Sequence, residues 1–213
     1  YGPFKICNKH TSESNYFFDN SLKMQNDLWG IRNIEEVTDE DLEDLCDAAE
    51  SAILDGGGFG WLKPPPRAVL GRYFRGVVLV PERHLFVGRL EDRVSAAIQL
   101  QEPPRNNEAQ SHAATLTTLF VSPWARGHGI GPRLIQAVEG RATDLGYLRL
   151  NFDVRATQID AVRLFEHLGF EHWGTDPAYA VVDGKLIPGH HYSKQLRNLP
   201  NKKKTKSGKR NLR

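Results

Sequence analysis

The sequence predicts an α/β domain, an α+β arrangement in which a mixed sheet of about six to seven strands is flanked by about four helices. Segments with apolar residues at every second position, typical of strands, alternate with segments whose apolar residues recur at helical spacing. In addition, an apolar strand at residues 112–121 leads through a glycine-rich turn into an amphipathic helix. The 213 residues, 39% of them hydrophobic and 25% charged, suffice for one globular domain.

The first part of the domain is predicted to contain one strand and two helices. Residues 31–37 have the pattern of a strand, and Thr38 followed by three acidic residues is typical of a helix N-terminus. This helix carries apolar residues on one face and ends at Gly56. Residues 56–61 are too rich in glycine for regular structure, and three prolines precede a second helix at residues 67–76.

A hairpin and the central strand are predicted next. Residues 85–90 and 94–100 are strands of similar length around a turn at residues 91–93. A polar loop at residues 101–111 separates this hairpin from the central strand at residues 112–121.

The remaining elements are predicted to be two helices and three strands. An apolar stripe from Ile130 to Leu145 marks a helix, and residues 148–154 alternate between apolar and polar side chains as a strand does. A short helix at residues 161–168 is followed by strands at residues 170–175 and 190–196. The two faces of the strand at residues 148–154 should therefore be core and cleft.

Three regions differ in composition. Residues 1–28 form a polar, irregular leader, residues 29–197 the folded domain and residues 198–213 a basic, flexible tail. Seven Lys and Arg residues place +7 on the tail, although the net charge of the chain is only +2. Such a tail either binds a nucleic acid or another anionic surface, or is a solvated segment that aids solubility.

No membrane span is expected, because no window holds the roughly 18 uncharged apolar residues that a spanning helix needs. Cys7 and Cys46 lie far apart, one in the polar leader, which argues against a disulfide framework. We therefore expect a cytoplasmic protein. The chain begins with Tyr1 rather than Met, so an organellar matrix is the alternative if a targeting peptide preceded it.

The glycine-rich turn at residues 126–131 has the composition of an anion-binding helix N-terminus. Backbone amides at the start of a helix lack partners and carry partial positive charge, and glycines let a phosphate approach them. A dinucleotide site is disfavoured, because no strand that ends in an acidic residue follows about 20 residues later. The turn thus indicates a diphosphate site, or else a simple reversal of the chain.

Three segments resemble the GNAT family of N-acetyltransferases. The glycine-turn motif of that family reads Gln or Arg, two residues of any type, Gly, one residue of any type, and then Gly or Ala. Arg126, Gly129 and Gly131 match its three specified positions. Residues 161–170 resemble the family's Ala-x-x-Leu-Tyr-x-x-x-Gly-Phe helix, and residues 184–192 are similar to its closing strands. The resemblance implies the GNAT acyl-CoA N-acyltransferase fold.

The resemblance also implies acetyl-CoA as co-substrate. Its pantetheine arm is expected to pair with a strand edge and its diphosphate to meet the amides of the glycine turn. The implied cofactor-binding residues are Leu119, Phe120, Val121, Arg126, Gly127, His128, Gly129, Ile130, Gly131, Gln158 and Phe165.

The activity that the resemblance implies is acetyl transfer from acetyl-CoA to a primary amine of a small molecule or peptide, by direct attack in a ternary complex. The alternative is a catalytically weak or idle acyl-CoA-binding module that joins a nucleoprotein assembly through the basic tail. Phe165 motivates this alternative, because it stands where the family has a general-acid tyrosine and has no proton to give. A homodimer is compatible with both.

The catalytic candidates are Asp153, His112 and Tyr192. Asp153 lies on the cleft face of its strand, and the imidazole of His112 can exchange a proton near neutral pH. Tyr192 or Tyr179 can replace the missing tyrosine as proton donor, and a water molecule is the other route.

The acceptor side is expected to be aromatic. Phe59 and Trp61 either cover the acceptor as a lid or pack on the domain. His190 and His191 are adjacent and so point to opposite faces of a strand, which argues against a metal site. The other residues expected on the acceptor side are Trp173, Tyr179 and Tyr192.

Overall fold

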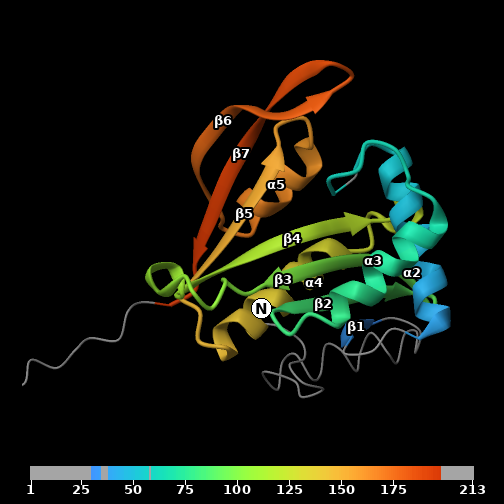
Figure 1. Cartoon of the computed structure of the whole chain (residues 1–213), viewed down its shortest axis with the longest axis horizontal. Helices are drawn as coiled ribbons and strands as arrows, with labels where there is room; N and C mark the ends of the chain where they lie inside the picture. The colour runs from blue at the N-terminus through green and yellow to red at the C-terminus, as the bar shows by residue number, and fades with distance from the viewer. Residues whose placement is uncertain (1–29, 35–37, 58, 198–213) are drawn as a thin grey trace, which may run out of the picture.

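A computed structural model describes residues 30–34, 38–57 and 59–197, which form one mixed sheet and four α-helices (Figure 1). The sheet has seven strands in the order β1-β2-β3-β4-β5-β7-β6. In chain order the elements are β1 (Gly30–Ile34), α2 (Asp39–Leu54), α3 (Arg67–Val78), β2 (Arg83–Leu90), β3 (Arg93–Gln101), the 3₁₀ turn η1 (Glu108–Gln110), β4 (Ala113–Val121), the 3₁₀ turn η2 (Pro123–Ala125), α4 (Ile130–Asp144), β5 (Arg149–Arg155), α5 (Ile159–His167), β6 (Glu171–Val182) and β7 (Lys185–Gln195). The predicted fold class and order of elements are confirmed.

The helices cover the sheet from both sides (Figure 1). Helices α2 and α3 pack against β2, β3 and β4 and enclose one apolar core, which includes Leu45, Leu70 and Phe74. Helices α4 and α5 pack against the other face, where Leu134 and Phe165 belong to the second core. The predicted core stripe of α4 is confirmed except for Leu145, which follows the last helical turn and is exposed.

Strand β4 stands in the middle of the sheet, as predicted. All neighbouring strands pair antiparallel except β4 and β5, which are parallel. The parallel pairing joins only residues 113–115 to residues 149–151. Both strands continue beyond this short ladder, so they run on without pairing to each other.

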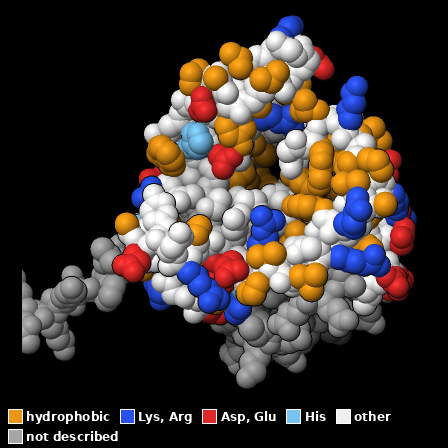
Figure 2. Space-filling model, viewed as in Figure 1, with side chains coloured by type: hydrophobic (Ala, Val, Ile, Leu, Met, Phe, Trp, Pro, Cys, Tyr) orange, Lys and Arg blue, Asp and Glu red, His pale blue; other side chains and the backbone are white. Residues whose placement is uncertain are grey.

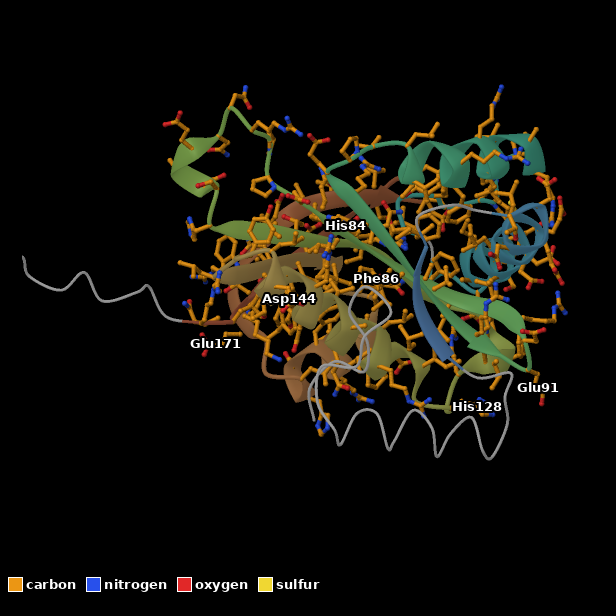
Figure 3. All side chains as sticks on the ribbon, turned by 90° about the horizontal axis from the view of Figure 1, so that it is seen from below. His84, Phe86, Glu91, His128, Asp144 and Glu171 are labelled. Carbon is orange, nitrogen blue, oxygen red and sulfur yellow. The ribbon has the colours of Figure 1, made fainter. Side chains whose placement is uncertain are left out.

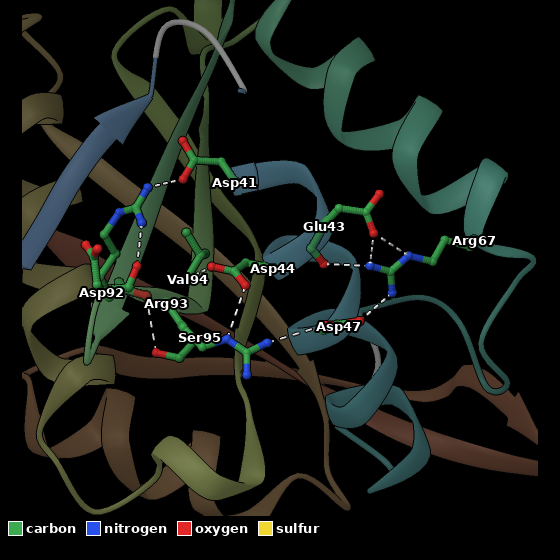
Figure 4. Close-up of polar contacts among 11 residues, drawn as sticks. Asp41, Glu43, Asp44, Asp47, Arg67, Asp92, Arg93, Val94 and Ser95 are labelled. Carbon is green, nitrogen blue, oxygen red and sulfur yellow. Dashed lines mark hydrogen bonds and ion pairs between the residues drawn. The ribbon is translucent and has the colours of Figure 1, made fainter. Parts of the chain in front are cut away.

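Acidic residues on α2 hold this helix against the turn of the β2–β3 hairpin (Figure 4). Asp41 forms an ion pair with Arg89, and Asp44 accepts the backbone amide of Val94 at 2.9 Å. The helix starts as predicted, because the side chain of Thr38 accepts the backbone amide of Asp41 at 3.1 Å. These contacts fix the helical layer on the side of the sheet where the acceptor is expected.

The last two strands are longer than predicted. Strands β6 and β7 continue to a tight turn at Asp183 and Gly184, both of which have positive φ. The sequence suggested only residues 170–175 and 190–196, because a register shift between Asp176 and Ala180, next to Pro177, interrupts the strand pattern. The longer hairpin projects from the body of the molecule (Figure 1).

Several predictions concern residues that the structure does not describe. The leader at residues 1–28, the tail at residues 198–213 and the end of the first predicted strand, residues 35–37, lie outside the described ranges.

Cys46 is a buried free thiol, and burial raises its pKa. Among the helices of the described ranges, none combines the length and hydropathy that crossing a membrane requires.

Glu102→Gln is expected to reduce the loss of stability that acid causes. Burial opposes the charge of Glu102, but hydrogen bonds from Tyr147 and His84 outweigh this effect and lower the pKa of the carboxyl group. A carboxyl group with a lowered folded-state pKa stabilises the fold above its unfolded-state pKa, and this contribution is lost as the pH falls toward the folded-state value. Urea unfolding at about pH 7 and about pH 4 should show a larger loss for the wild type than for the variant. Equal losses would contradict this account.

Candidate functional site

The open stretch between β4 and β5 is the centre of the candidate site. Pairing between the two strands ends at Thr115 and Asn151, whereas β4 extends to Val121 and β5 to Arg155. On its other edge, β4 stays bound to β3 as far as Val121. The edge of β4 that faces β5 is therefore free to pair with an extended ligand. Figure 2 shows a hollow on this face, between the β6–β7 hairpin and the helical side of the molecule.

A bulge in β4 lies beside this open stretch. Thr118 and Leu119 together stand opposite Ile98 of β3, and Thr118 has a φ of 56°. A β-branched residue in the left-handed region is strained, and such strain is concentrated at functional sites. The hydroxyl of Tyr73 on α3 lies 3.1 Å from Oγ1 of Thr118 and accepts the side-chain amide of Gln99 at 2.8 Å. These contacts hold the bulge from the helical side.

The glycine turn ends at the N-terminus of α4. Gly127 and Gly129 both have positive φ, 80° and 70°, and Gly129 is the N-cap residue. Because glycine has no side chain, the N-cap residue does not occupy the first backbone amides of the helix with a side-chain hydrogen bond. The side chain of Ile130 is buried and anchors the helix start in the core. Figure 3 shows His128 at this end of α4 and Asp144 at the other.

Basic side chains surround the turn. Nη1 of Arg126 lies 2.5 Å from the Asp55 carboxylate, and Nδ1 of His128 lies 3.0 Å from the carbonyl oxygen of Arg126. The guanidinium of Arg133, one helical turn further on, would lie 3.6 Å from a Cβ atom at Gly129. The turn is thus suited to a ligand with negative charge.

Gly131 differs from the other two glycines of the turn. It is buried, and a Cβ atom there would lie 3.2 Å from a methyl carbon of Leu164 on α5. Its small size lets α4 approach α5 closely. The clearance expected of three glycines thus comes from Gly127 and Gly129, and the backbone amide of Gly131 stays a predicted contact.

The loop between α2 and α3 is tied to both sides of the open stretch. The carbonyl oxygen of Gly56 accepts Nε2 of Gln158 at 2.7 Å and Nη2 of Arg155 at 3.2 Å. On the β4 side, Asp55 pairs with Arg126. Gln158, expected at the cofactor arm, thus contacts this loop in the structure.

The loop aromatics pack on the domain. Phe59 stacks on Phe120 with ring centroids 5.0 Å apart, and Trp61 meets Tyr73 edge to face at 5.2 Å. Both loop side chains are half-buried against the core that α2 and α3 enclose. Of the two interpretations, a lid over the acceptor or packing on the domain, the structure therefore favours packing.

Asp153 lies where the strands have parted. Its carboxylate accepts a hydrogen bond from the hydroxyl of Tyr179 on β6, and it pairs across the ladder with His191 on β7. Burial and the contact with Asp153 raise the pKa of Tyr179, so this phenol stays protonated near neutral pH. The ring of His191 is 5.2 Å from Trp173 and 6.1 Å from Tyr179. Asp153 and three residues expected on the acceptor side, Trp173, Tyr179 and His191, therefore meet on one face of the sheet.

The other two catalytic candidates lie elsewhere. His112 is exposed and lies just before β4. The next residue, Ala113, pairs with Arg149 of β5, which lies four residues before Asp153 on that strand. At about 3.3 Å per residue, this is about 13 Å along β5. Tyr192 is buried on the α5 side of the sheet and donates to Glu166 at 2.9 Å; burial and this bond raise its pKa to about 12. The three candidates thus do not form one cluster.

Phe165 is enclosed by other rings. It is fully buried, stacked on Phe152 at 3.6 Å and in edge contact with Phe170 at 5.0 Å. In this setting the ring supports the packing of α5 on the sheet.

Phe165→Tyr is therefore expected to lower the stability of the fold and not to accelerate acetyl transfer. A hydroxyl group that enters an apolar site without a partner costs about 1–3 kcal/mol. Urea unfolding measures the loss, and thiol release from acetyl-CoA measures the rate. An increase in rate with unchanged stability would show that the edge of the ring reaches the reacting atoms.

The described part of the chain holds no group of three or more His, Cys, Asp or Glu residues placed to bind a metal ion. His190 and His191 belong to different environments, since His190 contacts Thr175 and His191 contacts Trp173.

Comparison with known proteins identifies the family. The Acetyltransferase (GNAT) family matches residues 40–170. The chain belongs to this family. The match covers α2, the bulge, the glycine turn and α5, so the GNAT assignment includes every part of the candidate site described above except β6 and β7. A second match, to a family described as a protein of unknown function (DUF938), covers residues 1–46.

Curated and structural relatives agree with the GNAT assignment. A protein of Azospirillum brasilense, described as an uncharacterized N-acetyltransferase in the hisH-hisA intergenic region, is 56% identical over 128 residues, which are 60% of this chain and 76% of that protein. An N-acetyltransferase from Staphylococcus aureus Mu50 superposes with a TM-score of 0.69 at 20% identity, over 79% of this chain and 99% of that chain. A putative acetyltransferase from Salmonella typhimurium, described with its cofactor acetyl-CoA, has a TM-score of 0.67 at 15% identity, over 81% and 96% of the two chains. At these identities the structural likeness establishes the fold.

Two features of the GNAT site were not predicted from the sequence. One is the bond between Tyr73 and the bulge, for which no local pattern exists. The other is the packing of Tyr179 on Gly189, which is so close that a Cβ atom at Gly189 would be 2.1 Å from the ring carbon Cγ of Tyr179. A glycine opposite an aromatic residue is a usable signal only when the register of β6 and β7 is known.

Proposed function

We propose that this GNAT protein transfers an acetyl group from acetyl-CoA to a primary amine of a small molecule or peptide, by direct attack in a ternary complex. The observation that carries the proposal is the coincidence of two features at one end of β4. An unpaired strand edge lies beside the bulge, and a helix N-terminus with two left-handed glycines follows it. These features match two neighbouring parts of acetyl-CoA, its extended amide-containing arm and its diphosphate.

The donor follows from the same geometry. The free edge of residues 119–121 can bind the pantetheine arm, while the amides of residues 126–131 receive the diphosphate beside Arg133. The similar structure from Salmonella typhimurium carries acetyl-CoA in its description, which supports the same donor here. Fixing the thioester beside the amine supplies much of the acceleration, because a bound pair reacts at a high effective concentration.

The chemistry then needs one proton acceptor. The amine nitrogen attacks the thioester carbonyl carbon, whose oxygen is stabilised by a backbone amide near Phe120 or Val121. The carbon–sulfur bond breaks, and Asp153 receives the proton that the nitrogen loses. The thiolate of coenzyme A takes a proton from water, and Asp153 returns its proton to the hydroxide that this leaves, so the products are an amide and a free thiol. Tyr179 orients Asp153 by its hydrogen bond. In this proposal Tyr192 supports packing, since its hydroxyl is bound to Glu166 on the opposite face.

A direct test combines binding with turnover. Calorimetry should detect acetyl-CoA binding to the full chain, and a thiol reagent should detect coenzyme A released in the presence of a mixture of primary amines. Mass spectrometry of the mixture should identify an amine heavier by one acetyl group. Binding without thiol release or a new product would contradict the transferase proposal and favour an idle acyl-CoA-binding module.

A further inference from the structure

A cavity of about 450 Å³ opens next to the point where β4 and β5 part. Its floor is the short parallel ladder, with Ala113 and Thr115 from β4 and Arg149 and Asn151 from β5. The loop after β3 forms one wall, and Trp173 of β6 forms another. A volume of this size fits a small molecule. Asp153 is the next residue after Asn151 on the same face of β5, just beyond the lining residues and within the open stretch.

Arg149 brings a cation into this cavity. Its guanidinium donates to Oγ of Ser193 on β7, and no carboxylate lies within ion-pair distance of it among the described residues. The remaining N–H groups of the guanidinium suit a carboxylate, which accepts two parallel hydrogen bonds from arginine.

The one carboxylate among the lining residues is already engaged. Oε1 of Glu102 lies 2.7 Å from Nε2 of His84, and Oε2 accepts the hydroxyl of Tyr147 at 2.5 Å. Arg149 is joined in the lining by His112, one of the catalytic candidates, and by the uncharged polar groups of Thr115 and Asn151. The polar groups left for a ligand therefore favour an anion.

The position of the guanidinium limits the length of that ligand. Ser193, which Arg149 contacts, stands opposite Asn151, and the next pair on this face is Asp153 with His191. The two pairs are separated by two residues, which is about 7 Å along the strands. This axial spacing favours a ligand whose anionic and amine groups are only a few bonds apart.

We propose that Arg149 binds a carboxylate of the acceptor, and that the acceptor is a compact amino acid whose amine lies beside Asp153. This inference rests on the proposed acetyl transfer to a primary amine and narrows it to one class of small molecule. A protein lysine or the N-terminus of a long peptide lacks a carboxylate at this distance and is the class that the proposal excludes.

The test compares free α-amino acids with their α-amides, which have the same side chain but no carboxylate. With saturating acetyl-CoA, the wild type should acetylate the acids with kcat/KM at least about tenfold above the amides, as expected for loss of one charge-assisted contact. Arg149→Met should raise KM for the acids at least about tenfold and leave KM for acetyl-CoA unchanged. Arg149→Lys should retain part of the preference. Arg163→Met, an exposed arginine on α5, is the matched control and should behave as the wild type.

The outcomes separate this inference from the proposed function. If amides or short peptides are acetylated as well as the acids, the amino-acid class is overturned while acetyl transfer stands. Calorimetry of acids and amides in the presence of coenzyme A supplies a readout that needs no turnover, and circular dichroism checks that the variants fold. Binding of the acids that depends on Arg149 without any thiol release would support the cavity and overturn the transferase. No binding and no turnover would overturn both.

Discussion

Gly129→Asp should weaken acetyl-CoA binding at least about 100-fold, about 2.7 kcal/mol, while the chain stays folded. Gly129 caps α4 at a φ of 70°, a conformation that aspartate tolerates better than most residues. The new carboxylate would lie where the diphosphate is expected, close enough to Arg133 to pair with it. The carboxylate would then repel the diphosphate of acetyl-CoA and compete with it for Arg133. Calorimetry with acetyl-CoA measures the effect.

Gly129→Asn is the matched control for this substitution. Asparagine has the same shape as aspartate and occupies the left-handed region readily, but it carries no charge. It should retain most of the affinity. If both variants bind acetyl-CoA as the wild type does, the diphosphate does not sit at the N-terminus of α4. If both lose binding equally, shape rather than charge decides.

Asp153→Asn should lower kcat about 100-fold and leave the affinity for acetyl-CoA unchanged. The substitution keeps the size of the side chain but removes its ability to accept a proton, and general-base groups contribute about 100-fold or more to rate. Steady-state thiol release gives kcat, and calorimetry gives the affinity. Asp183→Asn, an exposed position in the β6–β7 turn with positive φ, is the control and should have no effect.

Tyr179→Phe separates orientation from proton transfer at the same site. Its ring would keep its place against Gly189, while the hydrogen bond to Asp153 is lost. We expect a smaller fall in kcat than for Asp153→Asn, with the pH dependence of the rate retained. A wild-type rate for Asp153→Asn would remove this carboxylate from the mechanism and leave a water relay.

The strongest sequence predictions rest on local patterns. The capping of α2 by Thr38, the irregular segment at residues 56–61 and the glycine turn each follow from the preferences of a few adjacent residues. The errors arise where a neighbour far along the chain decides the outcome. Leu145 has the spacing of a core residue, but the helix ends before the sheet can cover it.

The catalytic candidates show the same limit. Residue type and approximate strand position favour His112, Asp153 and Tyr192. Only the register of β5, β6 and β7 reveals that Tyr192 faces the buried side, while Tyr179 reaches Asp153. A shift of one residue in that register would exchange the two faces, so residue type alone could not choose between the tyrosines.

By itself, the sequence determined the order of strands and helices, the GNAT resemblance and the turn whose φ values require Gly127 and Gly129. These features depend on periodicity and backbone conformation, which neighbouring residues fix. Tertiary structure alone decided where β4 and β5 part, which tyrosine meets Asp153 and which arginine enters the cavity. Those choices depend on contacts between residues tens of positions apart, because strand register and helix packing bring such residues together only in the folded chain.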